Sequence, residues 1–173
     1  MIIDVINRQD IAHWRALLER NTIAGVAALR SLEGDPLAAL ARVKFEPIGR
    51  HPLEDRPLNM IEQVNQTFTY WVALKATELL LEWHPDACGF TLAPGAHAPR
   101  GTLDIESRKT GLVGAETFAA PPQSNRKLKG DLDKLALRPE MHRYVFFTAP
   151  NYNETRRRSD LERDGIQVWS LRL

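Results

Sequence analysis

The stretch TLDIESRKTGLVGAETFAA, residues 102–120, constrains the fold of this chain more than any other. Two runs rich in apolar and β-branched residues flank the segment RKTG, which is typical of two antiparallel strands joined by a tight turn. If Lys109, Thr110 and Gly111 form a three-residue loop, Gly111 takes the left-handed conformation that such loops need. The sequence therefore predicts a hairpin centred on residues 108–112.

This loop length sets which side chains share a face of the hairpin. Glu106 then lies opposite Gly114, and Asp104 lies opposite Glu116, because residues that oppose one another in a ladder share a face. A two-residue loop would instead place Asp104 opposite Ala115 and send Glu116 to the other face. The predicted apolar face holds Leu103, Ile105, Val113, Ala115 and Thr117.

Two carboxylates directly opposite each other destabilise a sheet unless something compensates their charge. They can be solvated, one can be protonated, or a cation can lie between them. Mg²⁺ suits such a pair because it keeps several waters and takes only one or two protein carboxylates. Asp104 and Glu116 are therefore candidate metal ligands, with carboxylates expected about 4–5 Å apart. The alternative is an ordinary solvated face, on which Glu106 is expected in either case.

The remaining segments predict helices and strands in alternation. Asn59 is a candidate N-cap for a long buried helix, with Glu62 three residues later as in a capping box. The run RYVFFTA, residues 143–149, is expected as a central strand buried on both faces. The other expected helices lie in residues 8–42, with Asp10 as N-cap, after PPQSN with Ser124 or Asn125 as cap, and in 153–163; the other strands lie in 88–92 and 166–173.

The proline-rich segment FEPIGRHPLEDRPLN, residues 45–59, is the best candidate for a boundary. We expect residues 1–58 to form a helical extension with this connecting loop, and residues 59–173 to form an α/β core. A hairpin followed by a helical crossover favours a mixed sheet in that core.

The composition points to a soluble, cytoplasmic protein. Cys88 is the only cysteine, which excludes an internal disulfide framework. The chain has no apolar stretch of membrane-spanning length, and MIIDVINRQD lacks the pattern of a signal peptide. Residues 1–99 carry a net charge of −3 and residues 100–173 carry +4. No nucleotide-binding glycine motif, zinc-ligand spacing or G-x-S-x-G segment occurs.

The order helix, three strands, helix and strand, with acids on the second and third strands, resembles the PD-(D/E)XK, or restriction-endonuclease-like, nuclease superfamily. The resemblance covers residues 59–173 and rests on the order of elements more than on sequence. It implies a restriction-endonuclease-like mixed sheet flanked by helices, preceded by the N-terminal helical extension.

The resemblance also implies roles for individual residues. Asp104 is similar to the acid of the second strand, and Glu116 to the glutamate of the E-x-K motif on the third. Glu62 is similar to an additional helix glutamate of resolvase-like branches. Leu103 stands where the family has a proline, and Phe118 stands at the lysine position.

In some branches of the superfamily the lysine comes from the following helix. This implies Lys127 as the catalytic lysine, with Lys129 as the alternative. The expected activity is hydrolysis of phosphodiester bonds in nucleic acid, with Mg²⁺ or Mn²⁺ held by Asp104 and Glu116. Arginines that could contact the nucleic-acid backbone are Arg126, Arg156, Arg157 and Arg158.

The sequence leaves two further hypotheses open. The first is a catalytically inactive nuclease-like module that binds nucleic acid or protein, which Phe118 favours. The second is a protein-binding component whose contact surface is the helical region of residues 1–45, forming a homodimer or binding another protein. No membrane partner is expected.

Overall fold

The computed structural model describes residues 1–95 and 101–173, which form two compact units. The sheet unit comprises Met1–Ile11 and Val72–Leu173, and the helical unit comprises Ala12–Trp71. Helices α1 (Arg8–Arg30) and α3 (Met60–Trp83) each contribute residues to both units. The limits of the units therefore fall inside two helices.

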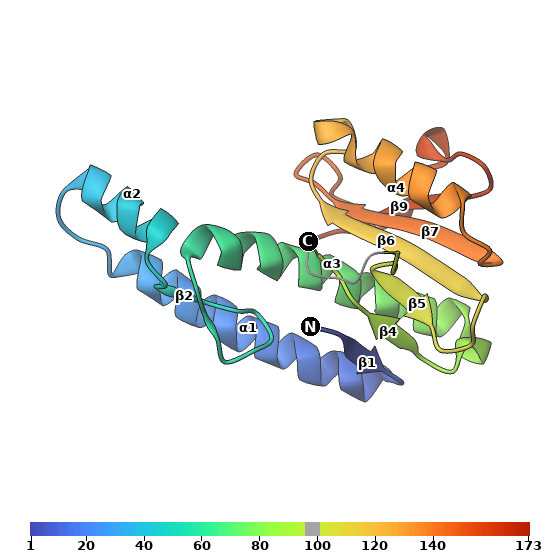
Figure 1. The fold of residues 1–173 in the computed structure, drawn as a ribbon, viewed down its shortest axis with the longest axis horizontal. Helices are drawn as coiled ribbons and strands as arrows, with labels where there is room; N and C mark the ends of the chain where they lie inside the picture. The colour runs from blue at the N-terminus through green and yellow to red at the C-terminus, as the bar shows by residue number, and fades with distance from the viewer. Residues whose placement is uncertain (96–100) are drawn as a thin grey trace. The chain divides into compact units, whose positions relative to one another are not determined.

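The sheet unit is built on a mixed sheet, as the sequence predicted. In the described residues this sheet has seven strands in the order β1-β4-β5-β6-β7-β9-β8. Only the pairs β6–β7 and β7–β9 are parallel, and the other neighbours are antiparallel (Figure 1). The strands are β1 (Ile3–Val5), β4 (Phe90–Leu92), β5 (Ile105–Ser107), β6 (Val113–Ala119), β7 (His142–Thr148), β8 (Arg156–Arg157) and β9 (Gln167–Ser170).

The elements that carry the candidate site follow one another as α3, β4, β5, β6, α4 (Lys127–Ala136) and β7. This is the predicted order of a helix, three strands, a helix and a strand. Strand β7 has a parallel neighbour on each side, and Tyr144–Thr148 are all buried, which confirms it as a central strand.

Apolar layers cover both faces of the central strands. On one face Phe118 stacks on Phe147 with ring centroids 5.4 Å apart, and leucines of α4 join this cluster. On the other face Trp83, at the end of α3, packs against Phe146 and Trp169. Figure 1 shows α4 lying along β6 and β7. Because both faces of β6 are covered, its side chains from Val113 to Phe118 are all buried, the acidic one included.

The hairpin between β5 and β6 has the expected register. Gly111 has a φ of +76°, the left-handed conformation that the turn requires. Ile105 pairs with Ala115 and Glu106 pairs with Gly114, as the three-residue loop predicted. This register places Glu106 and Glu116 on the face of β6 that α4 covers, because alternate residues of a strand share a face.

Gly114 gives a test of how tightly this face is packed. A methyl group at Gly114 would collide with Leu103 Cδ1 and lie 3.1 Å from Glu140 Cγ. We expect Gly114→Ala to lower the free energy of unfolding by about 1–3 kcal/mol, the usual cost of overpacking. Gly130→Ala is the matched control, because Gly130 lies in α4 and faces open space. The control is expected to stabilise the protein slightly; equal urea midpoints for the two variants would contradict this packing.

The helical unit and its flanks contain the helices expected in residues 8–42, with a different N-cap on the first. α1 is one continuous helix, and Asn7 caps it by accepting a hydrogen bond from Gln9 N at 2.7 Å. Asp10, the predicted cap, instead accepts hydrogen bonds from Ile6 N and Asn7 N inside the first turn. Asn59 does cap α3, since its Oδ1 accepts from Glu62 N at 2.9 Å. The unit also contains α2 (Pro36–Phe45), β2 (Gly49–Arg50) and β3 (Pro57–Leu58).

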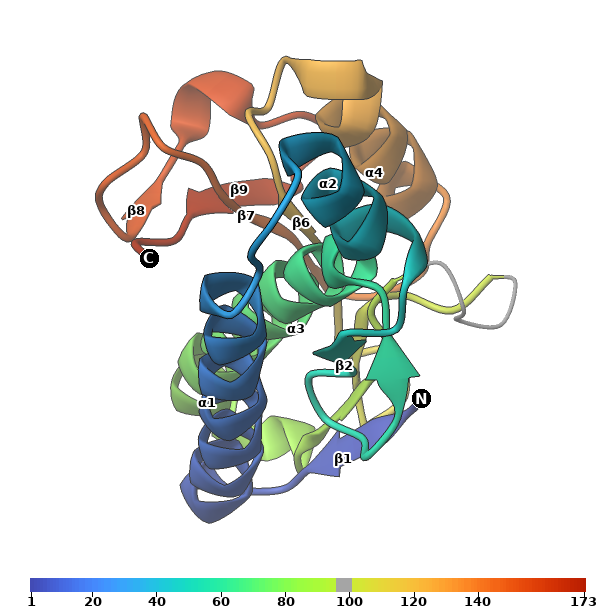
Figure 2. The same cartoon turned by 90° about the vertical axis from the view of Figure 1, so that its left-hand side faces the viewer.

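Two expectations in the second half of the chain were wrong in detail. Residues 153–163 are not an α-helix: they contain β8 and a single 3-10 turn, Ser159–Leu161. Arg156 and Arg157 are extended because they pair with β9. Figure 2 shows β7, β9 and β8 side by side near the C-terminus. At the start of α4, Arg126 occupies the cap position with a φ of +53°, rather than Ser124 or Asn125.

Among the residues described, none of the helices combines the length and the apolar composition that crossing a bilayer requires.

Candidate functional site

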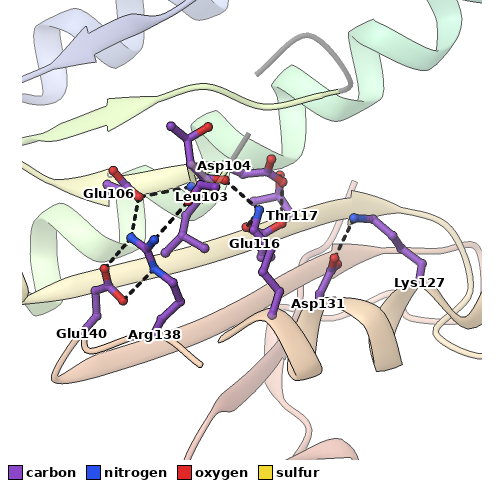
Figure 3. Close-up of polar contacts among 12 residues, drawn as sticks. Leu103, Asp104, Glu106, Glu116, Thr117, Lys127, Asp131, Arg138 and Glu140 are labelled. Atoms are coloured by element: carbon purple, nitrogen blue, oxygen red, sulfur yellow. Dashed lines mark hydrogen bonds and ion pairs between the residues drawn. The ribbon is translucent and has the colours of Figure 1, made fainter. Parts of the chain in front are cut away.

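The first predicted ligand, Asp104, lies where the β5–β6 ladder ends. β5 begins one residue later, so Asp104 has no partner in the ladder, contrary to the prediction that it pairs directly with Glu116. Its Oδ2 instead accepts hydrogen bonds from Thr117 N and Thr117 Oγ1, both at 2.8 Å (Figure 3). The carboxylate thus accepts a hydrogen bond from a backbone N–H of β6 that has no partner in the β5–β6 ladder.

The chain before Asp104 departs from the predicted alternation. Leu103 was expected on the face of Ile105, but it packs with Phe118 and the leucines of α4 on the opposite face, over Gly114. Arg138 stabilises this bend: its Nη1 donates to Gly101 O at 3.0 Å and its Nη2 lies 2.9 Å from Glu106 Oε1. Glu106 is thus engaged with Arg138, and its Oε1 also accepts from Leu103 N.

Glu116 lies in the middle of β6 and is only 3% exposed. Burial raises its pKa to about 7, and the negative charge of Asp104 contributes to the increase. Lys134 of α4 opposes both effects, because its ammonium lies 2.7 Å from Glu116 Oε1. The charge of Asp104 therefore acts on Glu116 inside the protein. Both carboxylates are buried, so neither lies on a solvated hairpin face. The predicted 4–5 Å separation stays a prediction.

Helix α4 presents three ionisable residues at helical spacing: Lys127, Asp131 and Lys134. Lys127 Nζ donates to Asp131 Oδ1 at 2.7 Å, so the predicted catalytic lysine is paired with an acid of its own helix (Figure 3). Burial raises the pKa of Asp131 to about 6, although Lys127 and Lys134 counteract the shift. Within the described residues, Asp131 Oδ2 is buried and has no hydrogen-bond partner.

Lys134 is the residue that the sequence interpretation missed. It lies two helical turns after Lys127, contacts Glu116, and donates to Thr102 O at 2.7 Å. It thereby links α4 to both sides of the hairpin. Its spacing from Lys127 and Asp131 was visible in the sequence. Which lysine reaches β6, however, depends on how α4 is placed along the strands.

Phe118, at the position of the family lysine, is 5% exposed and belongs to the apolar cluster beneath α4. Stacking on Phe147 fixes its role as a core residue. A positive charge beside Glu116 must therefore come from another element, and α4 supplies it through Lys134.

The side chains of Asp104 and Glu116 meet some of the requirements of a divalent-cation site. Within residues 1–95 and 101–173, no three side chains of His, Cys, Asp or Glu come together as a metal-binding group. Mg²⁺ needs only one or two carboxylates, and the all-oxygen pair of Asp104 and Glu116 suits Mg²⁺ or Mn²⁺. The mutual repulsion of these acids is what a cation would relieve.

The other predicted site residues belong to the helical unit, are exposed, or are engaged with other side chains. Glu62 is exposed and belongs to the helical unit. The guanidinium of Arg157 donates two hydrogen bonds to the carboxylate of Glu162, at 2.7 and 2.8 Å. Arg158 donates to Ser170 Oγ and lies over the ring of Tyr152. Arg126 and Arg156 are exposed and form no ion pair with any described residue.

Comparisons with protein-family models, with curated proteins and with solved structures found no match to this chain. The function is therefore inferred from the site itself.

The raised pKa of Glu116 predicts a pH dependence of stability. The folded protein holds the Glu116 proton up to about pH 7, whereas the unfolded chain releases it near the ordinary value of 4.5. The folded state therefore binds more protons between these values, and stability falls as pH rises through this window, by about 2–3 kcal/mol from this group. Asp131 acts in the same direction.

Burial lowers the pKa of His84, which has the opposite effect on stability in part of this window. The comparison between wild type and Glu116→Gln removes the His84 contribution, since both proteins share it. Urea unfolding at pH 5 to 8 is expected to show the wild type losing more stability with rising pH than the variant does. Parallel curves for the two proteins would show that Glu116 titrates at its ordinary pKa.

Proposed function

We propose that the protein hydrolyses phosphodiester bonds in nucleic acid with the help of a divalent cation held by Asp104 and Glu116. The observation that carries the proposal is the burial of these two acids within range of each other's charge, next to the ammonium of Lys134. Strongly perturbed buried acids with specific charged partners are typical of functional sites. The order of elements α3, β4, β5, β6, α4, β7 supports a restriction-endonuclease-like core.

Each residue has a defined task in this proposal. When bound, Mg²⁺ or Mn²⁺ would polarise the phosphoryl group and lower the pKa of a bound water. Asp104 is held in place by Thr117, so its second oxygen stays available for the ion. Glu116 offers its carboxylate from the rigid centre of β6. Lys134 stabilises the negative charge that develops on the phosphate in the transition state.

Lys134 replaces Lys127 as the proposed catalytic lysine. The contact between Lys134 Nζ and Glu116 Oε1 supports this assignment, whereas Lys127 contacts Asp131. Lys127 keeps an indirect role: Asp131 contributes to raising the pKa of Glu116, and Lys127 pairs with that acid. Arg126 and Arg156 are the proposed contacts to the nucleic-acid backbone, because both are exposed and free to pair with phosphate.

The second candidate is an inactive module on the same scaffold. One observation favours it: the ammonium of Lys134, 2.7 Å from Glu116 Oε1, already supplies a positive charge beside this acid. A single assay separates the candidates. The wild type and Glu116→Gln are incubated with plasmid and with labelled oligonucleotides over a titration of Mg²⁺ and Mn²⁺. Metal-dependent cleavage that Glu116→Gln loses supports the nuclease, and cleavage that survives the substitution would exclude this site as its source.

A further inference from the structure

A pocket of about 480 Å³ lies at the end of the two central parallel strands. Its lining comes from the loop after β6 (Pro121, Gln123) and the loop after β7 (Ala149–Tyr152). Ala119 and Thr148 form the last pair of these strands, so both loops leave the same edge of the sheet. In open α/β sheets, ligands bind in the crevice outside the carboxyl ends of the strands.

The chemistry of this lining suits an uncharged planar ligand. It consists of two prolines, an alanine, two amides and the ring of Tyr152, and none of these described lining residues carries a charge. The amides of Gln123 and Asn151 are exposed and make no hydrogen bond with any described residue. Amide groups can pair with the polar edge of a nucleobase, and an aromatic ring can stack on its face. A phosphate would instead need cations in the lining.

Tyr152 is held firmly enough to serve as a stacking platform. Its ring lies nearly perpendicular to that of Phe147, with centroids 4.8 Å apart, and the guanidinium of Arg158 lies 4.9 Å from its centroid. Its backbone N donates to Ala149 O, closing the turn that forms one wall of the pocket. A ring held by these two neighbours loses little conformational entropy when a base stacks on it.

The pocket also lies close to the proposed site along β6. Glu116 precedes Ala119, the last residue of the strand, by three positions, which corresponds to about 10 Å. The exposed Arg126 follows Gln123 at the start of α4, and Arg156 follows the turn that carries Tyr152. The two proposed phosphate contacts therefore lie, in sequence, shortly after lining residues of the neutral pocket.

We propose that this pocket receives an unpaired nucleobase of a polynucleotide, stacked on Tyr152 and bonded by Gln123 and Asn151. This inference rests on the proposed function, and it specifies the substrate as single-stranded or locally unpaired nucleic acid. A paired base could not enter, because its polar edge is already occupied by its partner.

Fluorescence anisotropy with a labelled single-stranded oligonucleotide and a matched duplex tests the proposal in EDTA, where metal-dependent cleavage is absent. Tyr152→Ala is expected to weaken single-strand binding about tenfold, whereas Tyr152→Phe keeps the ring and the affinity. Phe45→Ala, which removes an exposed ring of the helical unit, is the matched control and is expected to bind like wild type. Unchanged binding by Tyr152→Ala would overturn the proposal.

A second variant and a free nucleotide complete the binding experiment. If Tyr152→Ala fails to fold, the double variant Gln123→Ala/Asn151→Ala, which changes only exposed side chains, is expected to lose about threefold in affinity, and no loss would overturn the proposal. Adenosine monophosphate that binds as tightly as the oligonucleotide would likewise overturn it, in favour of free nucleotides. Binding that depends on Tyr152, without any cleavage, supports the pocket and counts against the proposed nuclease activity. Cleavage together with binding that does not depend on Tyr152 supports the nuclease activity and overturns the pocket.

Discussion

Replacing Asp104 with asparagine is expected to lower metal-dependent cleavage at least a hundredfold. Asparagine keeps the shape of the side chain and an oxygen that can accept the two hydrogen bonds from Thr117. It removes the negative charge that would bind the cation, and loss of such a ligand removes the charge stabilisation that the ion supplies. The measurement is the single-turnover rate on a labelled oligonucleotide at saturating Mg²⁺.

Asp133→Asn is the matched control for this substitution. Asp133 also lies in the sheet unit, but it is exposed and pairs with Lys129 and Arg163 on the surface. Its replacement is expected to leave the rate within about twofold, because exposed ion pairs contribute little. Equal rates for Asp104→Asn and the control would exclude Asp104 from the chemistry.

Asp104→Asn is also expected to remove part of the repulsion on Glu116. Because the charge of Asp104 helps to raise the pKa of Glu116, the variant should unfold at a higher urea concentration than wild type near pH 7. A variant that is more stable and far less active is typical of a functional site.

Replacing Lys134 with methionine is expected to lower the cleavage rate about a hundredfold, the usual cost of removing one group that stabilises charge in a transition state. Methionine keeps the length of the apolar stem, so packing of α4 against the strands is retained. Without the ammonium at 2.7 Å, the pKa of Glu116 rises further. Activity should therefore recover in part at higher pH, a response that a purely structural defect would not give.

Lys127→Met and Lys129→Met complete this series. Lys129 pairs with exposed Asp133 and is expected to be replaceable without loss. Lys127→Met leaves Asp131 buried without its partner, so a loss of stability is expected with a smaller loss of rate than for Lys134→Met. A larger loss of rate in Lys127→Met would return the catalytic role to Lys127.

The order of elements was predictable from the sequence because strong local signals mark it. The apolar run 143–149, the Asn59 cap and the left-handed Gly111 each depend on a few neighbouring residues. Strands β1, β2, β3 and β8 are only two or three residues long, so their pairing partners determine them rather than a pattern of their own. No periodicity in such short runs can indicate that pairing.

The candidate site was predictable only in part, for a related reason. The register of the hairpin follows from its turn, so the pairs Ile105–Ala115 and Glu106–Gly114 could be inferred. The bend at Leu103 could not, because it depends on Gly114 and on Arg138 of a later segment. The identity of the lysine depends on the position of α4 along the sheet, and both Lys127 and Lys134 lie on the face of that helix that meets the acids.

Isothermal titration calorimetry with Mn²⁺ at pH 8 tests the central claim most directly, because it measures the ion at the two acids without requiring a known substrate. The wild type is expected to bind one ion per chain, and Mg²⁺ is expected to compete for it. The double variant Asp104→Asn/Glu116→Gln is expected to show no binding, while Asp133→Asn binds like wild type. Equal binding by the double variant and the wild type, or no binding by either, would contradict the assignment of Asp104 and Glu116 as metal ligands.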